Sequence, residues 1–140
     1  MTLIPSDLRE AVVLRAGNRC EYCHLSQESQ VATFPVDHVI PVVAGGKTAL
    51  ENLAFSCPRC NATKWTRVAA EDPVSGQLVP LFNPRTEIWA EHFRWSESDA
   101  ALVEGLTPSG RATVALLELN SVAHLTVRRW LMAVGMHPPE

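Results

Sequence analysis

Two short cysteine motifs decide how this chain folds: Cys20-Glu-Tyr-Cys23 and Cys57-Pro-Arg-Cys60. Four thiolates in two such pairs supply the closed tetrahedral coordination of a structural zinc ion. The motifs contain all four cysteines of the 140-residue chain, which favours a metal site over an isolated redox pair. A four-sulfur site has no open coordination position, so we expect zinc to stabilise the fold and not to catalyse a reaction.

The segment between the motifs is too long for a compact zinc ribbon, so further structure must be inserted there. From Val31 to Ile40, β-branched and aromatic residues favour a strand, and the following Pro41 and Gly45-Gly46 favour a loop. Leu53-Ala54-Phe55 can form a second strand, and Pro58 can begin a helix that continues through Trp65. The predicted order is strand, loop, strand, helix, with Thr48 and Glu51 as a weak capping box in the loop.

The flanking segments read as mainly helical. Ser6 suits the N-cap of a first helix that ends at Gly17, and Asn83-Pro84, Thr107-Pro108 and Asn120 each favour a helix start in the tail. We therefore expect an α+β protein with one domain over residues 1–140. Its parts are an N-terminal helix (1–17), a zinc-stapled motif (18–67) and a mostly helical extension packed on it (68–140). The tryptophans are expected in the core rather than as platforms for base stacking: Trp65, Trp89, Trp95 and Trp130.

Composition excludes some classes of protein. The chain has 46% hydrophobic residues and no apolar run of the roughly 20 residues that a membrane span needs. Its first residues lack the basic and apolar regions of a secretory signal, so we expect a cytoplasmic protein without disulfides. The net charge of -3 argues against coating of nucleic acid by bulk electrostatics. Basic residues nevertheless gather in the first half, where a local positive face could form: Arg9, Arg15, Arg19, Lys47, Arg59, Lys64 and Arg67.

Polar residues lie beside and between the cysteine motifs in a recognisable order. The strings are Phe34-Pro-Val-Asp-His-Val-Ile-Pro41, Gly45-Gly46, Glu51-Asn-Leu53 and Cys57-Pro-Arg-Cys-Asn-Ala-Thr-Lys64. Over about residues 18–67 this pattern strongly resembles the zinc-stapled subgroup of HNH endonucleases, the ββα-metal nucleases. A tail of the type Pro80-Leu-Phe-Asn-Pro-Arg85, then Gly110-Arg-Ala-Thr113, is also similar to small bacterial HNH proteins.

The resemblance implies a metal-dependent endonuclease that leaves 3′-hydroxyl and 5′-phosphate ends. In-line attack of water on a phosphodiester needs a base near neutrality and a cation, and an imidazole, which ordinarily titrates near about pH 6.5, suits the base. The implied roles are His38 as general base, Asp37 and Asn61 as protein ligands of a catalytic ion, and Asn52 as the residue that holds the loop orienting His38. Because Asp37 and His38 are neighbours on a strand, a bend must bring both to one phosphate.

The sequence departs from the family name at its third letter, where Asn61 stands in place of histidine. One carboxylate and one amide make an oxygen-only site, which favours Mg²⁺ or Mn²⁺ and binds the ion weakly until a substrate phosphate joins it. Double-stranded DNA is the expected partner, with Lys64, Arg59 and Lys47 as contacts to nucleic acid.

Other functions remain open alongside the enzyme. The chain could be a catalytically inert zinc-stapled module that binds nucleic acid, a reading that the acidic net charge and Asn61 favour. It could also be a zinc-stapled interaction domain or, more remotely, a redox protein. The sequence leaves target specificity, DNA against RNA, nicking against double-strand cleavage, biological pathway and oligomeric state undecided.

Overall fold

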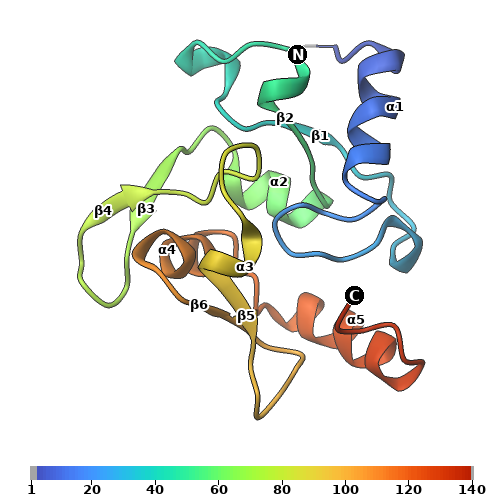
Figure 1. The fold of residues 1–140 in the computed structure, drawn as a ribbon, viewed down its shortest axis with the longest axis vertical. Helices are drawn as coiled ribbons and strands as arrows, with labels where there is room; N and C mark the ends of the chain where they lie inside the picture. The colour runs from blue at the N-terminus through green and yellow to red at the C-terminus, as the bar shows by residue number, and fades with distance from the viewer. Residues whose placement is uncertain (1–2, 140) are drawn as a thin grey trace. The chain divides into compact units, whose positions relative to one another are not determined.

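The computed structural model describes residues 3–139, which form two compact units (Figure 1). The first unit comprises Met1–Val68 and Asn83–Thr86, and the second comprises Ala69–Phe82 and Glu87–Glu140. The organisation of the chain as one domain stays a prediction. None of the helices over residues 3–139 combines the length and apolarity needed to cross a bilayer.

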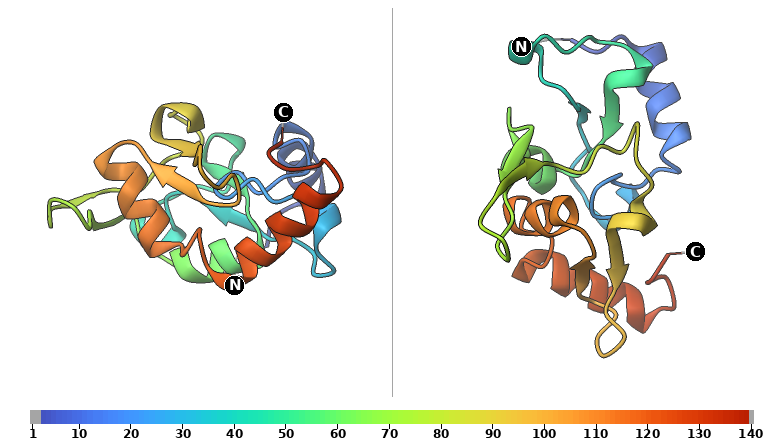
Figure 2. Two further views of the ribbon diagram at one scale, coloured as in Figure 1. Left: turned by 90° about the horizontal axis from the view of Figure 1, so that it is seen from below. Right: turned by 60° about the vertical axis from the view of Figure 1, so that its left-hand side comes forward.

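The first unit contains a helix, an antiparallel strand pair and a second helix. Helix α1 (Ser6–Arg15) precedes strands β1 (Val36–His38) and β2 (Leu53–Phe55), and α2 (Pro58–Lys64) follows. The strands pair with Asp37 opposite Ala54, and three-residue 3-10 turns lie in the connecting segments. The α+β class and the ββα core are thus confirmed, and Figure 2 shows β1, β2 and α2 from two further directions.

Local chemistry explains where α2 begins and ends. The sulfur of Cys57 accepts a hydrogen bond from the backbone N–H of Cys60 at 3.3 Å. Pro58 occupies the first helical position, where a backbone N–H would have no partner within the helix. The helix ends at Lys64, and Trp65 leaves it with a φ of 49°. The predicted start is confirmed, and the end differs from the prediction by one residue.

The core of the first unit joins α1 to the strand pair. Phe34 and Phe55 are fully buried with ring centroids 5.4 Å apart, and Val12 of α1 has no exposed surface. Two arginines of the helix fix the connections to the strands, because Arg9 donates to the carbonyl of Phe34 at 2.7 Å and Arg15 to that of Leu50 at 2.8 Å. These guanidinium groups therefore serve the fold, which reduces the basic face that the sequence suggested.

The second unit mixes three helices with two short hairpins. Strands β3 (Ala69–Glu71) and β4 (Leu78–Pro80) pair antiparallel, as do β5 (Phe93–Trp95) and β6 (Val103–Gly105). The helices are α3 (Trp89–His92), α4 (Pro108–Leu116) and α5 (Val122–Ala133). Thr107 caps α4 by accepting from Gly110 N–H at 3.0 Å, as its Thr-Pro sequence predicts.

The helix start expected at Asn83-Pro84 is wrong, whereas the last helix forms as expected but with a different capping residue. Asn83 accepts from the N–H of Arg85 at 2.8 Å and thereby closes a turn, and no helix begins before Trp89. The cap of α5 is Ser121 and not Asn120, whose amide instead bonds both the N–H and the carbonyl of Val103 at 2.9 Å. Asparagine competes for local backbone groups in several ways, so its presence alone does not identify a helix start.

The tryptophans divide between partly buried and exposed positions. The rings of Trp89 and Trp95 lie 5.3 Å apart in an aromatic cluster of the second unit, and both residues are partly buried. Trp65 and Trp130 are 74% and 67% exposed, so the expectation of burial is wrong for these two.

An ion pair between the buried Asp72 and the partly exposed Arg111 predicts that the stability of the second unit depends on pH. Arg111 donates to both oxygens of Asp72 at 2.9 and 2.8 Å, and these bonds hold the pKa of Asp72 well below its ordinary value. A depressed folded-state pKa contributes stability above the unfolded-state pKa of about 3.9, and that stability is lost as the pH falls through the folded value. We expect melting temperatures measured from pH 5 to pH 2 to fall less steeply for Asp72→Asn than for the wild type. Parallel profiles would contradict this assignment.

Candidate active site

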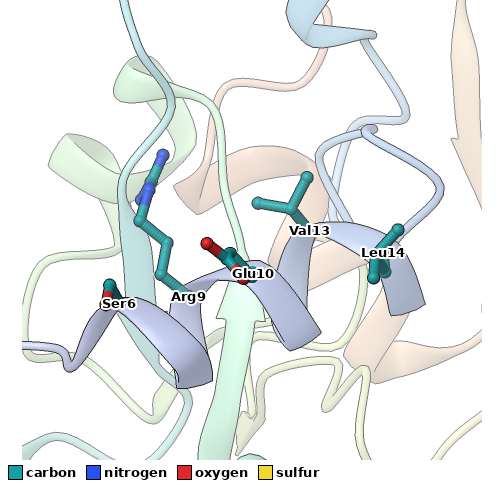
Figure 3. Close-up of a pocket in the computed structure, with 5 residues that line it drawn as sticks. All are labelled: Ser6, Arg9, Glu10, Val13 and Leu14. Carbon is teal, nitrogen blue, oxygen red and sulfur yellow. The ribbon is translucent and has the colours of Figure 1, made fainter.

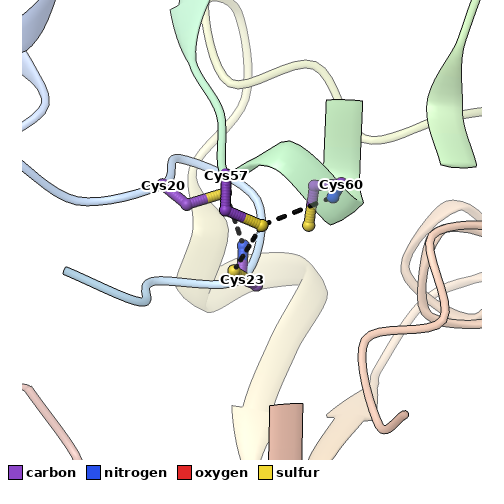
Figure 4. A group of neighbouring side chains, drawn as sticks. All are labelled: Cys20, Cys23, Cys57 and Cys60. Carbon is purple, nitrogen blue, oxygen red and sulfur yellow. Dashed lines mark hydrogen bonds between the residues drawn. The ribbon is translucent and has the colours of Figure 1, made fainter. Parts of the chain in front are cut away.

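The four cysteines converge on one buried cluster in the first unit. Their sulfur atoms all lie within 4.8 Å of one another, and each cysteine is at most 3% exposed (Figure 4). The sulfurs of Cys23 and Cys57 are 3.7 Å apart, which matches the edge of about 3.8 Å of a tetrahedron with zinc–sulfur bonds of about 2.3 Å. The cluster therefore fits a structural metal ion such as zinc.

The pKa values of the buried thiols are consistent with a bound metal ion. Burial raises the pKa of the Cys23 and Cys60 thiols well above the ordinary value, whereas hydrogen bonds from the other cysteines lower that of Cys57. Zinc stabilises thiolates directly, so a bound ion would remove the cost of burying several of them together. Among the described residues, no second group of three or more histidine, cysteine, aspartate or glutamate side chains forms a comparable cluster.

The cysteine motifs also place two side chains on Asp37. The hydroxyl of Tyr22, inside the first motif, donates to Oδ2 of Asp37 at 2.7 Å. Lys64, at the end of α2, contacts the same oxygen at 3.0 Å and Oδ1 at 3.4 Å. Tyr22, Asp37 and Lys64 are 1%, 4% and 1% exposed, so the three form a buried cluster beside the metal site.

Opposing effects act on the carboxyl group of Asp37. Its pKa is raised, because burial outweighs the ammonium of Lys64 and the hydroxyl of Tyr22, which act in the opposite direction. Lys64 also donates to the carbonyls of His38 and Val39 at 3.2 and 3.1 Å. One ammonium thus ties the carboxylate to the backbone that carries His38.

The position of Lys64 corrects its expected role. A lysine that contacts a phosphate needs an accessible ammonium, and this one is buried against a carboxylate and two carbonyls. The burial of Lys64 could not be predicted from the sequence, because its pairing with Asp37 depends on which segments the fold brings together. Arg59 and Lys47, the other expected contacts to nucleic acid, have exposed side chains.

His38 lies at the end of β1, half-buried. Its Nε2 is 2.8 Å from Oγ1 of Thr48, so the hydroxyl fixes the plane of the ring. Thr48 was predicted only as a capping residue, and the 3-10 turn at Leu50–Asn52 has Ala49 at its N-cap position instead. Because Asp37 and His38 are successive strand residues, their side chains leave opposite faces of β1.

Asn52 fixes the loop that follows His38. Its Oδ1 accepts from the N–H of Ile40 at 2.9 Å, and its Nδ2 donates to the carbonyls of Ile40 and Lys47, also at 2.9 Å. Gly46 packs so closely against these hydrogen-bonded residues that an added Cβ would be 1.7 Å from the carbonyl oxygen of Ile40. The residues from Ile40 to Lys47 are thereby closed into a loop beside His38.

Asn61 lies on α2 one turn before Lys64 and is half-buried. Together with Asp37 it offers the hard oxygen donors that Mg²⁺ or Mn²⁺ prefers. Among the described residues, Oδ2 of Asp37 has two close donors, whereas Oδ1 has the longer contact with Lys64. One oxygen of Asp37 therefore has fewer close donors than the other, and carboxylate and amide oxygens are donor types that suit such an ion.

A pocket lies along α1 and does not coincide with these residues. Its lining is Ser6, Arg9, Glu10, Val13 and Leu14 (Figure 3). It contains none of the predicted site residues and no pair of groups suited to acid–base chemistry.

Comparison with known families identifies this region. Residues 20–67 match the family model of the HNH endonucleases. We call these residues the HNH segment, after the family that they match. It covers about a third of the 140 residues and includes both cysteine motifs, the strand pair and α2. The family indicates a nuclease or a nucleic-acid-binding module, and the resemblance to the CxxC subgroup is confirmed by the four-cysteine cluster. No curated protein and no solved structure matches the chain.

The buried pair at the centre of the HNH segment predicts a large effect of Lys64→Met on stability. Methionine keeps the length of the side chain but leaves Asp37 buried without its counter-ion, and breaking a buried pair in this way typically costs about 3–5 kcal/mol. We expect chemical denaturation to show a loss of that order. Lys47→Met is the matched control, because Lys47 is exposed, and it should change stability by less than about 0.5 kcal/mol. Equal midpoints for the two variants would show that the pair contributes nothing.

Proposed function

We propose that the chain is a metal-dependent endonuclease that hydrolyses phosphodiester bonds in DNA. The observation that carries the proposal is the hydrogen bond between His38 and Thr48, within a segment that matches the HNH family. If Thr48 accepts from the Nε2–H group of His38, the other ring nitrogen keeps a lone pair and can take a proton from water.

The remaining residues of the site have supporting roles in this proposal. Asn52 holds the loop beside His38, and Lys64 fixes the backbone at His38 and Val39 and pairs with Asp37. Asp37 and Asn61 would hold Mg²⁺ or Mn²⁺. When bound, such an ion supplies positive charge that stabilises the developing charge on the phosphate and the leaving oxygen.

Cleavage assays on different substrates test the proposal. Zinc-loaded protein with Mg²⁺ or Mn²⁺ is incubated with supercoiled plasmid, single-stranded DNA and RNA, and a mobility-shift assay runs in parallel. We expect nicking of plasmid DNA. A salt-dependent mobility shift without cleavage under any divalent ion would support the inert nucleic-acid-binding module, which the acidic net charge and Asn61 favour. If the protein neither cleaves nor binds any of these substrates, both functions are rejected.

A further inference from the structure

Trp65 has a position that packing does not explain. It follows the last residue of α2 and is 74% exposed, so most of its indole surface stays in water. An exposed aromatic ring of this size gains little from burial, which is the usual reason for a tryptophan in a small protein. The residue therefore contributes little to the core of the first unit.

The backbone conformation of Trp65 is also strained, so this residue destabilises the fold without gaining from burial. Its φ is 49° and its ψ is -124°, a conformation that side chains bearing a Cβ rarely adopt. Strained backbone of this kind costs on the order of 1–3 kcal/mol and is concentrated at functional sites. A glycine would adopt the same turn without that strain, so the indole itself is the feature that needs an explanation.

The surroundings of Trp65 suit a nucleic acid. Residues 57–68 contain Arg59, Lys64 and Arg67 and no acidic residue, and the side chains of Arg59 and Arg67 are exposed. Lys64, which is buried, is already neutralised by Asp37. The exposed charged residues of this segment, Arg59 and Arg67, are therefore both basic, although the chain as a whole is acidic. An exposed aromatic side chain among positive charges is the combination that binds single strands, where bases stack on the ring.

We propose that Trp65 is a stacking platform for an unpaired base, and that the HNH segment binds single-stranded or gapped DNA in preference to intact duplex. The inference deepens the proposed function and rests on it. Stacking requires a free face of a base, which a gap or a single strand provides and a continuous duplex does not. Trp65 lies next to the helix that carries Asn61, so a stacked base would position its strand at the end of α2.

The test measures binding to labelled oligonucleotides by fluorescence anisotropy at fixed salt, with His38→Ala as the background so that no cleavage occurs. Three probes are compared: a single strand, a gapped duplex and an intact duplex. Trp65→Ala should weaken binding to the first two about tenfold or more and change binding to the intact duplex by less than threefold, since stacking contributes about 1–3 kcal/mol per base. Trp65→Phe, which keeps an aromatic face, should retain most of the affinity.

Trp130→Ala is the matched control. Trp130 is 67% exposed and belongs to the second unit, so its removal should leave all three affinities unchanged. Trp65→Gly should combine weaker binding with a melting temperature above that of Trp65→Ala, because glycine relieves the positive φ. Equal affinities for Trp65→Ala and Trp130→Ala, or equal losses by Trp65→Ala on all three probes, would overturn the proposal.

Failure of this inference is distinguishable from failure of the proposed function. If the wild-type protein nicks plasmid DNA and Trp65→Ala does not weaken binding to the probes, the proposed nuclease stands and only the stacking platform is rejected. Protein that binds none of the probes and cleaves no substrate loses both.

Discussion

His38→Ala is expected to lower the rate constant of plasmid nicking by about 10²- to 10⁴-fold, the usual contribution of a general base. The imidazole lies at the end of β1, where Thr48 holds it, beside the loop that Asn52 closes. Because neither the cysteine cluster nor the buried pair of Asp37 and Lys64 uses the ring of His38, zinc content and affinity for DNA should stay near those of the wild type. Single-turnover nicking and a parallel mobility-shift assay provide the two measurements.

A second variant, His38→Gln, distinguishes loss of the general base from loss of the hydrogen bond to Thr48. His38→Gln can keep a hydrogen bond to Thr48 but has no group that accepts a proton near neutral pH. It should be as inactive as His38→Ala. Nicking at the wild-type rate by either variant would remove His38 from the role of base.

Cys57→Ser is expected to unfold the first unit. Cys57 supplies one of the four sulfurs and also caps α2, so its replacement removes a ligand and weakens the helix that carries Asn61 and Lys64. Structural zinc in small sites contributes on the order of 10 kcal/mol or more of apparent binding free energy, which exceeds the stability of many small domains. Removing zinc from the wild-type protein with a strong chelator should have the same effect.

Tyr22 offers a local probe of this unfolding. It is the only tyrosine of the chain and is 1% exposed beside the cysteine cluster. Its ring should be protected from nitration in the zinc-loaded protein and become reactive in Cys57→Ser. A variant that melts like the wild type and keeps Tyr22 protected would show that zinc does not hold this unit together.

The parts of the fold that depend on local chemistry were predicted from the sequence. Cysteine spacing indicated the cluster, and the sequence around Pro58 indicated the start of α2. Strand β2 at Leu53–Phe55 was also predicted with the observed bounds, whereas the extended run from Val31 forms a strand only over Val36–His38. A β-propensity alone does not decide which residues of an extended run find a partner strand.

The parts that depend on tertiary contacts were missed. Lys64 and Tyr22 meet Asp37 from positions 27 and 15 residues away, and no local pattern marks a lysine as a buried counter-ion. Strands β3 to β6 have three residues each, too short for an alternation of polar and apolar residues to stand out. The exposure of Trp65 could not be inferred either, since tryptophan is usually buried and the positive φ appears only in the structure.

The most direct test of the central claim is a titration of Mn²⁺ into zinc-loaded wild-type protein with supercoiled plasmid. We predict nicking that rises with Mn²⁺ to saturation and is strongly reduced in Asn61→Ala, which leaves the buried pair of Asp37 and Lys64 intact, while the zinc content of the two proteins stays the same. Nicking that needs no added divalent ion, or that Asn61→Ala performs at the wild-type rate, would contradict the account.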